Sequence, residues 1–442
     1  MLFEISEKAE KEISKYSDDY EIYLELEKVL QLDAQKNDLS FAKEEINIGI
    51  GIRIISENKL GFAYSSDINK IEDVAKKAYL NSKLNEADEN FCFAQNTKLD
   101  NVKNIYDPKF ENLDVSEASE FLESILETCV ENNCEPTSGS FAASLENNLI
   151  TNSNGVSAFN KFTDFSAFVS INAEKNGEKS TAYDSISSCN FDLDGEKLAN
   201  ETCKVAKDSI GGVTVETKDT KVILDYRGAV GLLNTFVNAF NADNVQRGRS
   251  ILKDKIGKPI VDTNISIYDD GTLEGGLNSS ISDGEGVRTE KTCLVKDGIL
   301  KGFIYDIYTA KKENSNKNTD DDIKSTANGF RGSYAGTPSV SPSNIIFDFK
   351  EQVDISEIEN GFLATDVLGA HTANPISGDF SVEANNAFLI ENGEISKPVK
   401  KAMISGNIFQ VLSDCNGVKS ELRQYGSFLI PKILFNNLRV VG

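Results

Sequence analysis

The chain has 442 residues, of which 39% are hydrophobic and 26% are charged, and 46 Lys and Arg against 70 Asp and Glu give a net charge of −24. That composition is typical of a globular protein with more than one domain. A chain this acidic repels nucleic acid and anionic membranes, and we expect neither as a partner. It has no apolar run of about eighteen residues and no secretory signal at its N-terminus, which favours a cytoplasmic protein.

Residues 1–95 are predicted to form a first domain in which helices cover one face of a sheet. Apolar residues recur at helical spacing in two segments and alternate with polar residues in three others. The predicted helices are 3–15 and 67–82, and the predicted strands are 22–32, 46–54 and 61–67. Gly49 and Gly51 lie on the strand face opposite the isoleucines, so we expect another segment to pack closely against the backbone there.

A polar stretch at 95–114 leads into a second domain, predicted at 110–215. Asp114 and Glu117 have the spacing of a capping box at the start of a helix. The residues expected on the buried face of that helix are Phe121, Leu122, Ile125, Leu126, Cys129 and Val130. Asn154-Gly155 and Asn176-Gly177 each separate two alternating segments, which predicts two β-hairpins before a last helix at 194–209.

Residues 220–442 are predicted to form a third, β-rich domain. A short apolar strand at 222–224 leads into a helix whose buried face carries Leu232, Leu233, Phe236, Val237 and Phe240. Further hairpin turns at Asp297-Gly298 and Asn392-Gly393 indicate a largely antiparallel sheet. The fold class is therefore α+β, with N-terminal layers of helix on sheet followed by a largely antiparallel, β-rich C-terminal domain.

The segment Lys311–Tyr334 has almost no apolar residues, and a loop of this length in a compact domain is usually functional or disordered. Its run Asp320–Asp322 has the oxygen ligands of a hard-cation site, although a solvated acidic loop explains it better. The seven cysteines include no CxxC pair. Cys129 and Cys134 are separated by four residues, and we interpret them as buried thiols rather than metal ligands.

Several segments of the third domain resemble the C-terminal half of the TldD/PmbA family. They are the strand and helix of 221–250, Arg249-Ser250, Gly257-Lys258, Tyr268–Asp270, Ser282–Ala310 and Leu368–Asn407. The segment from Gly51 to Asp67, with the helix after it, resembles the family's N-terminal domain. The order and spacing of these segments, rather than any single motif, carry the resemblance, and it covers nearly the whole chain.

In the TldD branch of this family, the helix after the short strand carries an HExxxH motif, in which two His bind zinc and the Glu is the general base. The resemblance places Asn234, Thr235 and Ala239 at those positions. The chain is therefore similar to the TldE (PmbA) branch, the metal-free partner subunit. Amide, hydroxyl and methyl side chains are poor zinc ligands.

A zinc ligand contributed by a tail Cys in the TldD branch also has no counterpart in the last 22 residues, from Glu421 onward. Because His371 is the only histidine, a His-rich zinc site built from this chain alone is excluded. We expect no cofactor in this chain, and the resemblance implies zinc in the partner subunit.

Two groups of residues are candidates for a peptide groove. His371, Asn374, Ser377, Gly378 and Asp379 precede or begin an alternating strand, whose exposed edge would pair with an extended peptide. An ordinary packed strand is the alternative. A second interpretation makes His371 the base for Ser377 or Ser381, but residues so close in sequence rarely form a triad.

The other candidates are charged. Asp283 and Glu285, in a turn with Arg288, would clamp a peptide terminus, and Arg331 is a further groove candidate. The alternative is an internally salt-bridged turn.

The resemblance implies a non-catalytic, peptide-binding subunit of a two-subunit metallopeptidase, inactive alone. Its partner would be a TldD-like chain, in a heterodimer, or a second copy of itself, and its ligand would be an unfolded peptide. Two alternatives stay open: a self-sufficient hydrolase of unrecognised mechanism, and a homodimeric binding protein without a proteolytic role.

Overall fold

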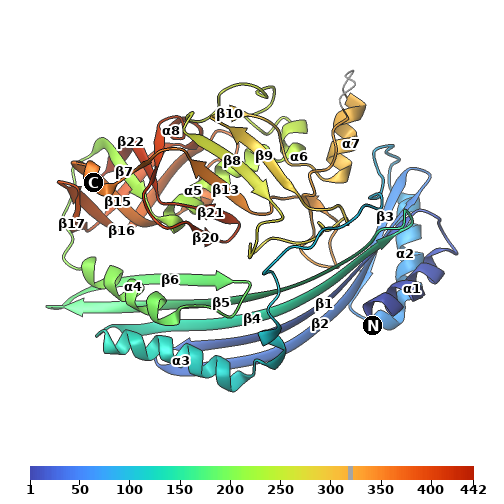
Figure 1. Ribbon diagram of the computed structural model, residues 1–442, viewed down its shortest axis with the longest axis horizontal. Coiled ribbons are helices and arrows are strands. Elements are labelled where there is room, and N and C mark those ends of the chain that lie inside the picture. The colour runs from blue at the N-terminus through green and yellow to red at the C-terminus, as the bar shows by residue number, and fades with distance from the viewer. Residues whose placement is uncertain (317–321) are drawn as a thin grey trace.

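One antiparallel sheet runs through the first two predicted domains in the computed structural model, which describes residues 1–316 and 322–442 (Figure 1). Its strands, in sheet order, are β3 (Lys59–Ser65), β2 (Asp38–Ser56), β1 (Tyr20–Gln35), β4 (Glu135–Asn152), β5 (Ser157–Lys175) and β6 (Glu178–Ser188). β1 and β4 come from different predicted domains, yet they pair over fifteen residues on each strand, from Glu21 opposite Asn152 to Gln35 opposite Ser138. The polar stretch at 95–114 therefore does not interrupt the sheet.

Helices cover the apolar face of this sheet (Figure 1). They are α1 (Leu2–Ile13), η1 (Ile68–Lys70), α2 (Ile71–Leu84), η2 (Pro108–Asn112), α3 (Val115–Glu131) and α4 (Gly195–Asp208). The last of them, α4, packs with α3 at the β6 edge, beside the third domain. The Asp114 carboxylate accepts the Glu117 N–H at 2.9 Å and so caps α3 as predicted. Val130 was expected to be buried, but it is 47% exposed. It follows the fully buried Cys129 directly and lies about 100° further around the helix, outside the buried stripe.

Alternation along the strands explains where the core lies. Ile22 and Leu24 of β1 pack with α1 and α2, whereas Phe165 and Val169 of β5 pack with α3 and α4. The β5–β6 hairpin turns at Asn176, whose φ of 55° is in the left-handed region, as an Asn-Gly turn requires. The predicted hairpins are confirmed.

The third domain contains two larger sheets. The first has the order β10 (Ile299–Leu300), β9 (Lys291–Lys296), β8 (Ile265–Asp270), β13 (Ile345–Phe349), β21 (Phe428–Ile430) and β20 (Arg423–Tyr425). The second has the order β14 (Gln352–Val353), β19 (Cys415–Val418), β22 (Ile433–Val441), β18 (Ala402–Asn407), β16 (Asp379–Glu391), β15 (Asn360–Leu368) and β7 (Lys218–Leu224), with β17 (Glu394–Val399) beside β16. β22 also pairs with β7, which closes the second sheet on itself.

Most of these pairs are antiparallel, and β13–β21, β14–β19 and β15–β7 are parallel. A short pair, β11 (Gly329–Phe330) and β12 (Ser339–Val340), lies apart from both sheets. The fold is thus α+β and largely antiparallel in its C-terminal half, as the sequence predicts.

The helices of this domain are α5 (Tyr226–Val237), η3 (Asn238–Phe240), α6 (Ala242–Gln246), α7 (Ile307–Asn316), η4 (Ile355–Glu357), η5 (Ala370–Thr372) and α8 (Ile408–Val411). All the apolar residues predicted on the α5 stripe are buried in one core with strands of both sheets. The expectation of a loop from Lys311 is wrong at its start, because α7 extends to Asn316. Across 1–316 and 322–442, no helix is long and apolar enough to span a membrane.

Candidate functional site

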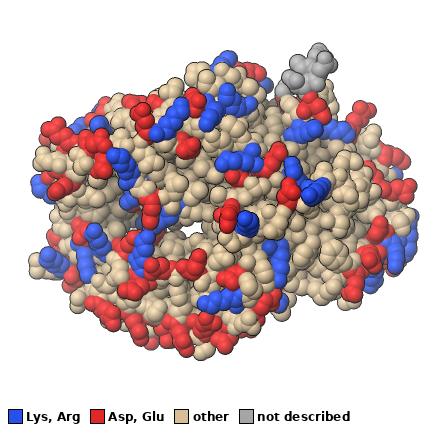
Figure 2. All heavy atoms as spheres, in the orientation of Figure 1, with Lys and Arg blue, Asp and Glu red and all other residues tan. Residues whose placement is uncertain are grey.

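A cavity of about 540 Å³ separates the polar face of the sheet formed by β1–β6 from the third domain. Figure 2 shows a gap between these two layers near the middle of the face in view. On the sheet side, the 540 Å³ cavity is lined by Tyr23, Glu25, Glu146, Asn148, Asn160 and Phe162. From the third domain, α5 and segments near 277–289 and 327–343 complete the lining. A volume of this size is typical of a ligand-binding site.

The period of two along β1 explains why this wall is polar. Ile22 and Leu24 face the helices, so Tyr23 and Glu25 between them face the cavity. The Glu25 carboxylate accepts the Tyr334 N–H at 2.8 Å. The apolar residues that predict β1 from the sequence therefore alternate along the strand with the polar residues that line the cavity.

Carboxylate and amide groups dominate the sheet side of the cavity. Burial raises the pKa of Glu146 to about 7, and the neighbouring carboxylates of Glu25 and Glu27 raise it as well, against the Asn148 hydrogen bond that lowers it. Asn148 donates to Glu146 at 3.1 Å, and Asn160 donates to the Asn148 side-chain oxygen at 2.9 Å. This array presents hydrogen-bonding side chains to a polar ligand.

Helix α5, with η3 directly after it, forms the opposite wall of the cavity and carries the three positions that the resemblance aligns with HExxxH. Asp225 accepts the Tyr226 N–H at 2.8 Å and starts the helix directly after β7. Asn234 lines the cavity, whereas Thr235 and Ala239 lie in the core at 8% and 2% exposure. Asn238, one turn after Asn234, also lines it.

This donor set does not fit zinc. One amide faces the cavity, and the hydroxyl and methyl groups at the other two positions are buried. In the part of the chain that the structure describes, no three His, Cys, Asp or Glu side chains are grouped as metal ligands. These three positions therefore offer zinc no ligand set.

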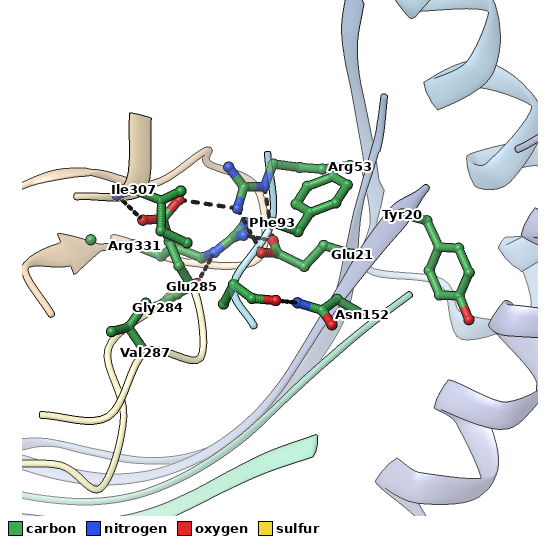
Figure 3. Close-up of polar contacts among 12 residues, drawn as sticks. Tyr20, Glu21, Arg53, Phe93, Asn152, Gly284, Glu285, Val287, Ile307 and Arg331 are labelled. Carbon is green, nitrogen blue, oxygen red and sulfur yellow. Dashed lines mark hydrogen bonds and ion pairs between the residues drawn. The ribbon is translucent and has the colours of Figure 1, made fainter. Parts of the chain in front are cut away.

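Four charged side chains form a buried cluster beside the cavity, here called the clasp: Glu21, Arg53, Glu285 and Arg331 (Figure 3). Arg53 donates to the two oxygens of Glu21 at 2.8 and 2.6 Å and to Glu285 at 3.3 Å. Arg331 donates to Glu21 as well. All four side chains are at most 8% exposed. The clasp thus links the first strands of the chain to the third domain.

Burial perturbs the clasp carboxylate that comes from the third domain. Burial raises the pKa of Glu285, although the positive charge of Arg53 opposes the shift. The Ile307 N–H donates to the same carboxylate at 2.9 Å. The Arg53 guanidinium also makes a cation–π contact with the Phe93 ring, whose centroid lies 5.2 Å away.

The charged groove candidates are brought together, but their hydrogen bonds are internal. Arg331 donates to the Gly284 carbonyl at 2.6 Å in addition to Glu21. The Asp283 carboxylate accepts the N–H groups of Glu285, Val287 and Gly329 at 2.8–2.9 Å. Asp283 and Arg331 line the cavity, and Glu285 lies behind them in the clasp. These groups therefore bond within the protein in this structure, and a clamp on a peptide terminus stays a prediction.

Arg288 of the same turn is directed elsewhere, to Asp100, at 2.8 Å. The salt bridges of the turn are therefore made with distant segments, and its own arginine takes no part in the clasp.

Tyr334 packs on the two strand glycines, which confirms the close approach predicted for them. A Cβ at Gly49 would lie 2.3 Å from the Tyr334 ring, and one at Gly51 would lie 2.4 Å from the Tyr334 carbonyl oxygen. The glycine pair was the sequence signal. Nothing in the sequence identified Tyr334 as the partner, because the two segments lie far apart along the chain.

The groove candidates around His371 lie in a separate, exposed turn and do not line the cavity. The Asn374 side chain accepts the N–H groups of Ile376 and Ser377 and closes the turn. The Ser377 hydroxyl donates to Asp379 at 2.7 Å, so its proton points to a carboxylate and not to the imidazole of His371. Hydrogen bonds from Asn407 and Ser377 lower the pKa of Asp379.

The expectation of a peptide-binding edge at this turn is wrong for most of β16. β15 pairs with Glu383–Glu391 on one flank, and β18 and β17 pair on the other. Gly378 is in the left-handed region at φ 83°, and a Cβ there would lie 2.4 Å from the Phe409 ring. The glycine is thus required by packing inside the domain, not by a ligand.

The acidic run and the cysteine pair are two further features that the sequence singled out. Asp320 and Asp321 lie outside the described residues, and Asp322 accepts a hydrogen bond from Asn314 at 3.0 Å. Cys129 and Cys134 are buried in the core of the second domain, as expected.

A second cavity, of about 400 Å³, lies between α4 and the third domain. Its charged groups pair with one another, as Arg423 does with Glu201 and Lys432 with Asp225, both at 2.9 Å.

Comparison with known proteins identifies relatives along the whole length. Family models described as PmbA/TldA metallopeptidase domain 1, central domain and C-terminal domain match residues 20–82, 108–210 and 217–442. An uncharacterised protein of Methanocaldococcus jannaschii is 36% identical over 392 residues, 88% of each chain. A metalloprotease TldD homolog of Haemophilus influenzae is 26% identical and covers 85% of this chain and 80% of its own.

The fold has a close structural relative. The crystal structure of TldE from Thermococcus kodakarensis matches with a TM-score of 0.89 at 25% identity, covering 99% of this chain and 100% of its own. Sequence and structure agree that this chain belongs to the PmbA/TldD metallopeptidase family.

Proposed function

We propose that this chain is the non-catalytic, peptide-binding subunit of a two-subunit metallopeptidase, whose TldD-like chain supplies the HExxxH helix and the zinc. The observation that carries the proposal is the α5 wall of the cavity. The helix keeps the family position beside a large cavity, but presents the Asn234 amide there. Thr235 and Ala239 are buried, so neither places a ligand or a general base in the cavity.

The lining supports binding of an extended peptide. The Asn234 and Asn238 side chains each carry a donor and an acceptor, the same pair that a peptide group carries, whereas the Asn160 amide is bonded to Asn148 and Ser282 within the protein. Tyr23 and Phe162 add apolar contact area on the sheet side. Amides that pair with backbone groups do not discriminate between side chains, which suits a subunit that binds unfolded chains of varied sequence.

The test uses the purified full chain, a TldD-like chain from the same organism, and their mixture. Zinc is measured by mass spectrometry, and turnover is measured with an unstructured fluorogenic peptide. We expect zinc in the TldD-like chain only, and turnover in the mixture that a chelator abolishes. Stoichiometric zinc in this chain alone, or turnover by this chain alone that survives chelator, contradicts the proposal.

A matched pair of variants tests the peptide-binding role. Asn234→Leu removes a cavity amide from the α5 wall, whereas Asn101→Leu changes an exposed Asn outside the cavity. In the mixture we expect Asn234→Leu to raise KM with little change in kcat, and Asn101→Leu to leave both unchanged. Equal effects of the two substitutions would remove the cavity from the proposal.

A further inference from the structure

The second cavity, of about 400 Å³, lies at the start of helix α5, whereas the 540 Å³ cavity lies beside the later turns of the same helix. Tyr226 and Arg227, the first residues of α5, line the second cavity together with residues of α4, β15 and β16. Among the described residues, none lines both cavities. A volume of this size is typical of a site for a small ligand, so the second cavity is a separate candidate site.

Arg227 is a buried cation of this cavity whose hydrogen-bond donors are mostly unused. Its side chain is 10% exposed, and its ion pair with Asp184 is 3.8 Å long, which is beyond hydrogen-bonding distance. A guanidinium carries five N–H donors. Across residues 1–316 and 322–442, Arg227 makes one hydrogen bond, from Nη1 to the Tyr183 carbonyl oxygen. Buried donors without acceptors, beside an open cavity, favour an anionic ligand.

The Arg227 guanidinium is also held in one orientation. Its central carbon lies over the Tyr183 ring, 4.4 Å from the ring centroid. Arg423, the other arginine of the lining, differs, because it donates to Glu201 at 2.9 Å and to Glu421 at 3.3 Å. Stacking fixes the plane of the Arg227 guanidinium, so a planar carboxylate can accept two of its free N–H groups at once.

The rest of the lining selects the class of anion. Its charged residues are four Lys or Arg and five Asp or Glu, so a dianion would be repelled, whereas a single carboxylate needs only the Arg227 guanidinium. Leu363 and Phe388, both 5% exposed, line the same cavity together with Val205 and Ile395. An apolar group that contacts these side chains leaves water, which adds to the affinity.

We propose that this cavity binds a small monocarboxylate with an apolar body, in which the carboxylate pairs with Arg227 and the apolar body contacts Leu363 and Phe388. The C-terminal residue of a short apolar peptide belongs to this chemical class. The site shares no residue with the cavity at Asn234, and the inference stands independently of the peptide-binding role proposed for that cavity.

Isothermal titration calorimetry of the full chain with N-acetyl-L-leucine tests the proposal. N-acetyl-L-leucinamide lacks the charge of this probe, and acetate lacks its apolar body. We expect N-acetyl-L-leucine to bind at a single site, roughly tenfold more tightly than either of the two. Inorganic phosphate should not compete, because it is largely a dianion at pH 7.5. No saturable binding of N-acetyl-L-leucine up to about 10 mM, equal binding of the amide, or competition by phosphate overturns the proposal.

Variants locate the site, with circular dichroism as a check of folding. Arg227→Met removes the charge and should raise the Kd roughly tenfold. Ile395→Asp changes a residue of the lining that is 52% exposed, and the added negative charge should raise the Kd about three- to tenfold. Its matched control is Ile376→Asp, 54% exposed and outside the lining, which should leave the Kd unchanged.

Asn234→Leu, in the other cavity, should also leave the Kd for N-acetyl-L-leucine unchanged. Because Ile395 is open to solvent, its variant decides the matter even where Arg227→Met does not fold. Binding that Ile395→Asp leaves unchanged, or that Asn234→Leu weakens, places the probe outside the second cavity and overturns the proposal.

Discussion

Replacing Glu21 by Gln removes the carboxylate that both arginines of the clasp share. Arg53 donates to it at 2.8 and 2.6 Å, and Arg331 donates to the same group. The Glu21 side chain is fully buried and Arg331 is 1% exposed, so water cannot replace the lost contacts. The variant leaves two buried cations with Glu285 as their remaining clasp carboxylate.

The magnitude follows from these distances and this burial. Two unit charges about 4 Å apart attract by about 4 kcal/mol at an effective dielectric of about 20, and much of that attraction offsets the cost of burying the ions. Leaving a buried charge without its partner typically costs about 3–5 kcal/mol. We expect Glu21→Gln to lower the free energy of unfolding by that amount, and Arg331→Met to cost a similar amount.

Urea titration at pH 7 measures both effects. The double variant Glu21→Gln/Arg331→Met should lose at least about 1 kcal/mol less than the sum of the single losses, because the second substitution removes the charge that the first left unpaired. Glu174→Gln is the control, since its pair with Lys179 has side chains 55% and 63% exposed and should matter by at most about 1 kcal/mol. Additive losses, or a Glu21→Gln variant as stable as the wild type, would refute the reasoning.

Three other predictions concern the cavity and the packing around it. Glu146 has a pKa of about 7 in the folded chain against about 4.3 when unfolded, so the folded chain binds the extra proton and wild-type stability falls as pH rises between those values. Glu146→Gln does not titrate, so its free energy of unfolding in urea titrations should rise relative to that of the wild type by up to about 1.4 kcal/mol per pH unit within that window. The exposed control Glu123→Gln should show no such rise. Gly49→Ala and Gly51→Ala should each lower the melting temperature, and adding Tyr334→Ala should rescue only the Gly49 variant, because Gly51 meets the Tyr334 carbonyl and not its ring. Rescue of both glycine variants would show that Gly51 does not contact the Tyr334 carbonyl oxygen. Finally, Asn234→His/Thr235→Glu/Ala239→His should yield neither bound zinc nor peptidase activity, and should lose about 1–3 kcal/mol of stability because Ala239 is 2% exposed. Zinc analysis and turnover check this, and an active triple variant would show that these three positions suffice for a metal site without the tail Cys.

Much of the fold could be predicted because its signals are local. The Asn176-Gly177 turn, the Asp114 cap and the buried stripe of α5 each depend on residues within a few positions of one another, and the structure confirms all three. The expected burial of Val130 was wrong, because this residue lies about 100° around the helix from the buried Cys129 and so falls outside the buried stripe. The expected loop from Lys311 was wrong as well, since a polar helix that lies against other elements need not carry an apolar stripe.

The candidate site was only partly predictable. Helix α5 and the turn at Asp283 were singled out in the sequence, and both lie at the cavity. The turn at His371 was singled out with them, yet it lies outside the cavity, because proximity to a glycine and a strand does not distinguish packing from binding. Glu21, Arg53 and Tyr334 were missed, since each acts on a residue far away in the sequence.

The sequence by itself determined the helices and strands of the first two domains, the strand and helix at 222–240, the hairpin turns and the family, together with the non-ligand side chains at 234, 235 and 239. Only the tertiary structure showed that β1 and β4 join two predicted domains in one sheet and that the polar side of β1 forms a cavity wall. It alone revealed the clasp that ties this wall to the third domain. The physical reason is range: periodicity and turn chemistry are set by neighbouring residues, whereas a pairing between strands or a buried ion pair depends on which distant segments the folded chain brings together.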